Sequence, residues 1–121
     1  MNASEVIHIP LPLKIVSVAN LREHWTTRAG RARMQRATTA ALLRAHNPPL
    51  LPITVVLTRV AARQLDSDNL AHAFKACRDG VADWLGVPDN DPRVTWEYGQ
   101  RKGKGCAMAE GAVIGRMGRT P

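Results

Sequence analysis

Residues 65–94 read LDSDNLAHAFKACRDGVADWLGVPDNDPRV, and the rest of the chain is organised around this stretch. Its apolar side chains recur at intervals of four, three, four and three residues, which is typical of the buried face of a helix. The five residues are Leu70, Phe74, Cys77, Val81 and Trp84. Gly86 and Pro88 follow them, and both are ordinary stop signals for a helix. The stretch therefore predicts a buried helix over residues 69–85.

Strand and helix signals flank this helix on both sides. The elements predicted, in chain order, are a strand at 6–13, a helix at 25–46, a strand at 53–62, the helix at 69–85, and strands at 94–100 and 106–114. This βαβαββ order predicts an α+β (α/β) fold, in which a mixed β-sheet packs against two helices. The domain is expected to span residues 1–114, with a flexible tail at 115–121.

Two of these elements carry more detailed expectations. The strand at 6–13 contains prolines and is expected near an edge of the sheet, whereas 53–62 is apolar on both faces, as in a central strand. The helix at 25–46 is expected to begin at a cap formed by Thr26 or Thr27. Its predicted core face, at helical spacing, consists of Met34, Ala37, Ala41 and Ala45.

Composition limits the class of protein. The chain has 121 residues, enough for one domain with a modest core, and 45% of them are hydrophobic. No run approaches the roughly 20 apolar residues of a membrane span, and the N-terminus has no secretory pattern, so a cytoplasmic protein is expected. Cys77 and Cys106 are 29 residues apart and form no zinc motif, and Cys77 is expected in the core.

The acidic residues are concentrated in one place. Six of the ten lie in residues 65–94, although the net charge is +7. If the backbone is extended at Asp66, the side chains of Asp66 and Asp68 face one volume of space, where two like charges repel unless a proton or cation lies between them. A second pair, Asp89 and Asp91, follows the predicted helix. Such oxygen ligands suit Mg²⁺ or Mn²⁺, so the cluster predicts a metal site that faces a polyanion.

Local structure offers an alternative explanation for the same carboxylates. An Asp directly before a helix caps its free N–H groups, which would account for Asp68, or for Ser67 in its place, but leaves Asp66 unexplained. Asp89 and Asp91 lie in a Pro-Asp-Asn-Asp-Pro turn, where Asp is common because it forms local hydrogen bonds.

The order of these residues resembles a known family. Asp66-x-Asp68-Asn69-Leu70, a helix with Lys75 and Asp79-Gly80, then Gly86-Val87 and Asp89-Asn90-Asp91 are similar to the RusA family of Holliday-junction endonucleases. The resemblance implies a Mg²⁺-dependent, structure-selective endodeoxyribonuclease that acts as a homodimer on Holliday junctions or other branched DNA in recombination and repair.

The resemblance also implies roles for single residues. Asp66, Asp68 and Asp91 would be catalytic metal ligands, with Asp89 as the substitute for Asp91. Asn69 would contact DNA, and Lys75 would assist catalysis. The family places its lysine four residues after the second Asp, where this chain has His72. Either Lys75 serves from one turn further on, or three residues are inserted before it.

Basic residues form two further groups. The denser one lies in and before the first predicted helix and consists of Lys14, Arg22, His24, Arg28, Arg31, Arg33 and Arg36. The second consists of Arg101, Lys102 and Lys104. Both are expected to contact DNA phosphates, although a charge run is also usual on a solvated surface.

A rival interpretation is a non-catalytic basic DNA-binding protein, in which the carboxylates only cap and turn. A third is a small basic subunit of a protein or RNA assembly. Convergence of Asp66, Asp68 and Asp91 separates the nuclease from the other two, because only the nuclease requires it.

Overall fold

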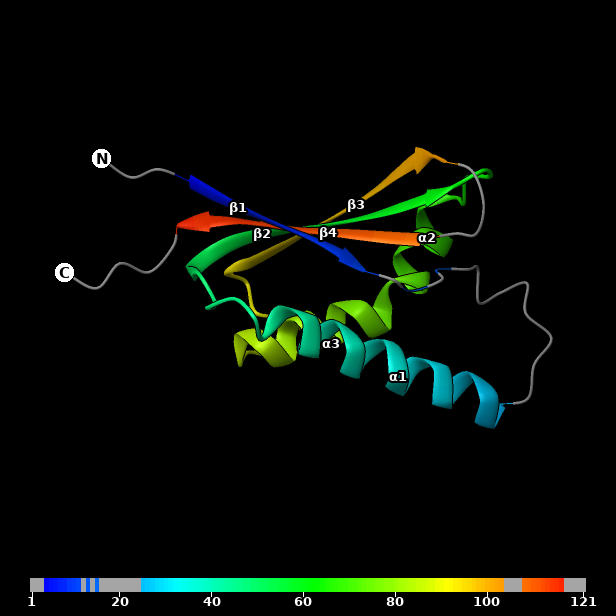
Figure 1. Ribbon diagram of the computed structural model, residues 1–121, viewed down its shortest axis with the longest axis horizontal. Coiled ribbons are helices and arrows are strands. Elements are labelled where there is room, and N and C mark those ends of the chain that lie inside the picture. Colours follow the sequence, from blue (N-terminus) through cyan, green and yellow to red (C-terminus); the bar gives the residue numbers. More distant parts are fainter. Residues whose placement is uncertain (1–3, 12, 14, 16–24, 104–107, 117–121) are drawn as a thin grey trace.

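Seven elements make up the computed structural model, which describes residues 4–11, 13, 15, 25–103 and 108–116 (Figure 1). They are β1 (Ser4–Leu11), α1 (Trp25–Leu43), β2 (Leu50–Ala61), α2 (Ser67–Ala73), α3 (Lys75–Leu85), β3 (Val94–Lys102) and β4 (Met108–Arg116). The predicted α+β class is confirmed. β4 continues two residues beyond the predicted strand end at 114, and residues 117–121 of the predicted tail lie outside the described ranges.

The four strands form one sheet in the order β1-β4-β2-β3. β2 runs parallel to β3 and antiparallel to β4, and β4 runs antiparallel to β1. The proline-containing β1 therefore lies at an edge, as predicted, and β2 lies inside the sheet. Because β2 is an inner strand, it pairs with a neighbouring strand on each side up to the point where the chain leaves the sheet.

The helices all lie on one face of the sheet (Figure 1). Alternate residues of β2 point to this face, and Ile53, Val55 and Leu57 there are at most 3% exposed. The residues between them, such as Val56, are only partly buried. The predicted central position of β2 is confirmed, and its second face is only partly buried because the helices cover the other one.

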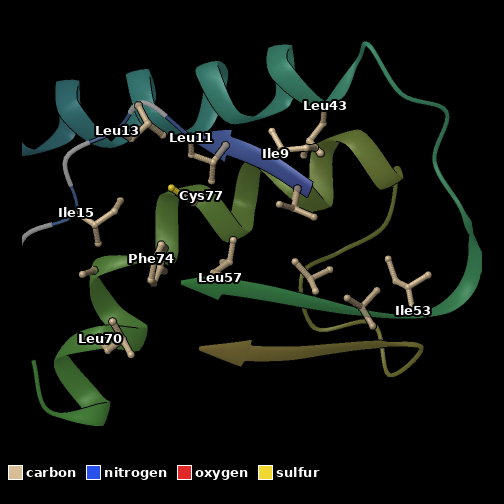
Figure 2. Packing of buried hydrophobic residues seen from close by; sticks show 14 residues of the cluster. Ile9, Leu11, Leu13, Ile15, Leu43, Ile53, Leu57, Leu70, Phe74 and Cys77 are labelled. Carbon is tan, nitrogen blue, oxygen red and sulfur yellow. The ribbon is translucent and has the colours of Figure 1, made fainter. Parts of the chain in front are cut away.

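The predicted helix at 69–85 is two helices that meet at Phe74. Phe74 has φ −92° and ψ 0°, which ends α2 and begins α3. Its side chain is fully buried and stacks on Tyr98 of β3, with ring centroids 6.0 Å apart. The predicted apolar stripe is confirmed. Leu70 and Cys77 lie in the core with Phe74 (Figure 2), Val81 is also buried, and Trp84 is partly buried against the same cluster. Gly86 ends α3 in the left-handed conformation, as expected of a terminal glycine.

The core face of α1 differs from the prediction. Met34 is 51% exposed, and Ala37, Ala41 and Ala45 are exposed as well. The buried face consists of Gln35, Thr39, Ala40 and Leu43. This face packs against α3 at Gly80, where a Cβ atom would lie only 2.5 Å from the backbone oxygen of Arg36. Close helix packing, not the count of apolar residues, therefore decides which side of α1 faces inward.

The ends of α1 also differ. The helix begins at Trp25, so Thr26 and Thr27 lie within its first turn and do not cap it. It ends at Leu43, and residues 44–46 form a turn in which the His46 N–H donates to the Leu43 carbonyl (2.8 Å). None of the helices among the described residues is long and apolar enough to cross a membrane.

Candidate functional site

Asp66 caps α2 at the point where the chain leaves the sheet. Its backbone is extended (φ −68°, ψ 166°), and its Oδ1 accepts a hydrogen bond from the Asn69 backbone N–H at 2.9 Å. Its Oδ2 accepts from the Asn69 side-chain amide at 3.0 Å. The cap is therefore Asp66, and the expectation that Asp68 or Ser67 fills this position was wrong. Asp68 lies in the first turn, where a negative charge favours the helix dipole.

The loop that carries Asp66 is fixed from two sides. The Gln100 side-chain amide of β3 accepts from the Leu65 N–H and donates to the Leu65 carbonyl, both at 2.7 Å. The buried Arg59 of β2 donates to the carbonyls of Ile15 (2.7 Å) and Arg63 (2.5 Å). Burial lowers the pKa of this guanidinium. Asp66 therefore follows a backbone that side chains of two neighbouring strands hold in place.

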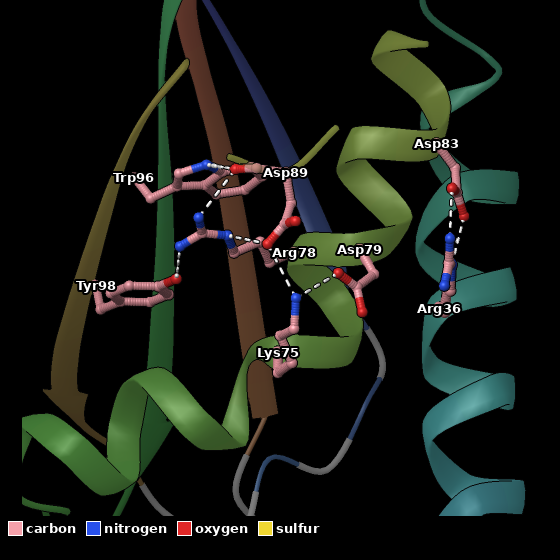
Figure 3. Close-up of polar contacts among 8 residues, drawn as sticks. All are labelled: Arg36, Lys75, Arg78, Asp79, Asp83, Asp89, Trp96 and Tyr98. Atoms are coloured by element: carbon pink, nitrogen blue, oxygen red, sulfur yellow. Dashed lines mark hydrogen bonds and ion pairs between the residues drawn. The ribbon is translucent and has the colours of Figure 1, made fainter. Parts of the chain in front are cut away.

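The second acidic pair follows α3, and Asp89 lies within a network of cationic partners (Figure 3). Its Oδ2 accepts from Lys75 Nζ at 2.9 Å and lies 3.0 Å from Arg78 Nε, an ion pair in which the buried Nε does not reach hydrogen-bond geometry. The hydrogen bond from Lys75, and then the charges of Lys75 and Arg78, hold the pKa of Asp89 below its ordinary value, against a smaller opposing effect of burial.

Arg78 organises this turn, although it was not among the residues predicted from the sequence. Its Nη2 and the Trp96 indole N–H both donate to the Asp89 carbonyl at 2.9 Å, and its Nη1 donates to the Tyr98 hydroxyl at 3.1 Å. The guanidinium lies 4.7 Å from the centroid of the Trp96 ring, within cation–π range. The alternation of Trp96 and Tyr98 on one face of a strand was the available signal for this arginine site.

Asp91 is bound within its own turn. Its carboxylate accepts from the Arg93 backbone N–H (2.9 Å), Nε (3.0 Å) and Nη2 (2.8 Å). These hydrogen bonds lower the pKa of Asp91 to about 2. Its local partner is therefore the neighbouring arginine, as the turn interpretation anticipates.

Lys75 is similarly engaged. It donates to Asp79 Oδ1 as well as to Asp89 Oδ2, both at 2.9 Å, and the two hydrogen bonds raise its pKa. Lys75 is thus an exposed side chain that pairs with two carboxylates. His72, the other candidate for the lysine position, is exposed on α2 one turn before Lys75.

The predicted carboxylates do not form a closed metal cage. Among the described residues, no group of three or more His, Cys, Asp or Glu side chains could hold a metal ion. Asp66 and Asp68 lie together at the start of α2, whereas Asp89 and Asp91 lie in the turn after α3. The two pairs thus lie at the ends of different helices, and the described residues do not gather three acids at one point.

A basic cleft of about 290 Å³ lies between α1 and the pair α2–α3. The α1 side is lined by Arg28, Arg31, Ala32, Arg33, Gln35 and Arg36. The opposite side is lined by His72, Ala73, Lys75, Ala76 and Asp79. Four of the predicted phosphate-binding arginines therefore share one concave surface.

One of those arginines already has a strong partner within the protein. Arg36 forms a bidentate ion pair with Asp83 of α3, with Nε and Nη2 at 2.7 and 2.8 Å from the carboxylate oxygens (Figure 3). The pair raises the pKa of Arg36 and lowers that of Asp83. Lys102 is exposed at the end of β3, and the predicted contacts at Lys14, Arg22, His24 and Lys104 lie outside the described residues.

No known protein family matches this chain, and no curated protein is significantly similar to it. The resemblance to RusA endonucleases therefore depends on the motif residues alone.

Proposed function

We propose that this protein is a Mg²⁺-dependent endonuclease that cuts branched DNA, such as a Holliday junction, in recombination and repair. The observation that carries this proposal is a difference in charge compensation within the acidic stretch. Asp79, Asp83, Asp89 and Asp91 each form an ion pair with a lysine or arginine. In the described part of the chain, neither Asp66 nor Asp68 does so, and both are exposed.

The two exposed carboxylates of Asp66 and Asp68 are enough to bind Mg²⁺. Mg²⁺ keeps several waters and is usually bound through one or two carboxylates together with substrate phosphates. Asp66 and Asp68 have the required oxygen donors, and Mn²⁺ accepts the same ligands. When bound, such a cation supplies the Lewis-acid chemistry that phosphodiester hydrolysis needs. A metal role for Asp91 or Asp89 requires that Arg93, or Lys75 and Arg78, first release these carboxylates.

Other residues of the chain have supporting roles in this proposal. Asn69 orients Asp66 through two hydrogen bonds, and the Gln100 side chain fixes the residue before it. The arginines of the cleft, which lie across from the end of α2 and the first turns of α3, hold DNA phosphates. Lys75 keeps the turn at Asp89 against α3. A homodimer forms part of the proposal, since the two strands of a two-fold symmetric junction are cut most simply by two sites with the same symmetry.

The test is cleavage of a synthetic four-way junction. We expect cutting with Mg²⁺ and none with EDTA. Asp68→Asn keeps the side-chain size but removes an anion that a hard cation requires, so cleavage should fall by orders of magnitude while junction binding survives. Glu97→Gln, a matched loss of one negative charge on an exposed strand position, should cut at the wild-type rate. Cleavage by Asp68→Asn at the wild-type rate would exclude this residue from the site.

The second candidate is a DNA-binding protein without nuclease activity. One observation favours it: no three metal-binding side chains converge among the residues that the structure describes. Moreover, capping of α2 accounts for Asp66 without a metal. Tight junction binding by the wild type, without cleavage in Mg²⁺ or Mn²⁺, would establish this alternative.

A further inference from the structure

The cleft between α1 and α2–α3 is lined by charged side chains and by three alanines, which are together called its alanine floor. Arg28, Arg31 and Arg33 lie along one wall, and His72 and Lys75 along the other. The remaining small side chains of the lining are Ala32, Ala73 and Ala76. These alanines come from both sides of the cleft, so the ligand that fills it needs an apolar face in addition to negative charge.

The charge of the cleft is positive after its internal ion pairs are considered. Among the described residues, Asp79 is the one acidic residue in the lining, and Lys75 donates to it at 2.9 Å. Arg36 is compensated by Asp83. Arg28 and Arg33 are exposed and form no ion pair with a described carboxylate. An anionic ligand therefore meets at least two arginines whose charge no described acid neutralises.

The size of the cleft selects among polyanions. A volume of about 290 Å³ lies at the lower limit of pockets that enclose small organic ligands. A DNA duplex is far too wide to enter, and it could contact the arginines only from outside. A free phosphate ion would leave the alanine floor uncovered. One nucleotide, with an anionic phosphate and an apolar base face, satisfies both surfaces, because bases stack well on guanidinium and apolar groups.

We propose that this cleft binds one unpaired nucleotide of a DNA strand, with its phosphate against Arg28 and Arg33 and its base over Ala73 and Ala76. The substrate it favours is DNA in which a nucleotide has left the stack, as at a branch point or a single-stranded flap. This binding role goes beyond the proposed cleavage, since it requires neither a metal ion nor the carboxylates of Asp66 and Asp68.

The experiment compares two ways of disabling the cleft, with EDTA present throughout. Ala76→Leu fills the floor and keeps every charge, whereas the double variant Arg28→Ala/Arg33→Ala removes charge and keeps the space. Fluorescence anisotropy measures binding of a short labelled oligothymidylate and of a blunt duplex. A third variant, Arg44→Ala/Arg63→Ala, removes two exposed arginines outside the cleft as a matched charge control.

Ala76→Leu should weaken binding of the single strand roughly tenfold or more, since stacking contributes about 1–3 kcal/mol per base, and should leave duplex binding nearly unchanged. Arg28→Ala/Arg33→Ala should weaken both by more than the Arg44→Ala/Arg63→Ala control does. Wild-type affinity of Ala76→Leu for the single strand, in a variant with an unchanged melting curve, would overturn the proposal. If Ala76→Leu lowers the melting temperature, Ala32→Leu, which fills the cleft from the α1 side, provides the same test. None of these outcomes depends on whether a junction is cut.

Discussion

At the scale of single residues, the acidic side chains differ mainly in their partners. The carboxylates of Asp83, Asp89 and Asp91 accept hydrogen bonds from arginine or lysine, and each pKa is lowered as a result. Asp66 accepts only from Asn69 among the contacts described. The acidic residues of this stretch thus fall into two kinds. Some form ion pairs that hold helices and turns in place, and others have no cationic partner among the described residues.

This division predicts how stability depends on pH. A carboxylate with a lowered pKa stabilises the folded state above its ordinary value of 3.8, and this contribution disappears as the pH falls through the folded value of about 2 for Asp91. We therefore expect the free energy of unfolding to fall between about pH 4 and pH 2. Asp91→Asn should make that part of the curve shallower, measured by urea unfolding at each pH. An identical pH dependence in Asp91→Asn and wild type would contradict the Arg93–Asp91 pair.

At the scale of elements, the packing of α1 on α3 depends on Gly80. A Cβ atom at this position would meet the Arg36 carbonyl at 2.5 Å and Thr39 Cβ at 2.9 Å. A backbone carbonyl within a helix cannot move aside as the end of a flexible side chain can. The Asp79-Gly80 pair in the sequence motif thus has a structural explanation: the glycine permits close approach, and the aspartate holds Lys75.

Gly80→Ala should therefore destabilise the protein by about 1–3 kcal/mol, the usual cost of overpacking. Gly30→Ala is the matched control, because its Cβ would meet only the end of the Arg33 side chain at 4.0 Å. Since alanine is the better helix former, this control should gain up to about 1 kcal/mol. Denaturant unfolding measures both changes, and equal effects of the two substitutions would mean that α1 does not approach α3 at Gly80.

The elements also show what sequence patterns can and cannot predict here. The stripe from Leu70 to Val81 was predictable because each of its positions is apolar and faces the sheet. The inner face of α1 was not, because it includes Gln35 and Thr39, whose burial is possible only through local bonds such as Thr39 Oγ1 donating to the Gln35 carbonyl (2.8 Å). Alanines on the opposite face gave a misleading helical period.

The same limit applies to the candidate site. The positions of Asp66 and Asp68 at a helix start after a strand were predictable, because strand and helix signals bracket them. The partners of Asp89 were not predictable. Lys75 and Arg78 lie in the first turns of α3, whereas Asp89 follows its C-terminal end, so tertiary packing decides this pairing. Charge type alone does not tell which carboxylates a protein neutralises internally.

At the scale of the whole molecule, the arrangement of charge predicts how binding depends on salt. The net charge is +7, and the four arginines of the cleft lie on α1, across from the end of α2 and the first turns of α3. The logarithm of the binding constant for duplex DNA should fall linearly with the logarithm of salt concentration, because counterions bound to the DNA are released. Each phosphate contact that is lost should reduce the slope by about 0.9.

Arg28→Ala/Arg33→Ala should therefore flatten this dependence on a blunt duplex by up to about 1.8 if both residues contact phosphate. Arg44→Ala/Arg63→Ala should change the slope less, although it removes the same charge. Equal slopes for the first variant and the wild type would place the duplex surface elsewhere, with Arg101 and Lys102 at the end of β3 as the next residues to replace.

The position of β4 in the sheet has a consequence for synthesis on the ribosome. β4 is the last described strand along the chain, yet it lies between β1 and β2, and Ser4 pairs with Arg116. Until residues 108–116 have left the ribosome, β1 lacks the strand with which it pairs, and one edge of β2 is open. Open strand edges pair readily with other chains. A fragment that ends after β3 should therefore be prone to aggregation. Slow emergence of β4 likewise prolongs the exposure of β1 and β2.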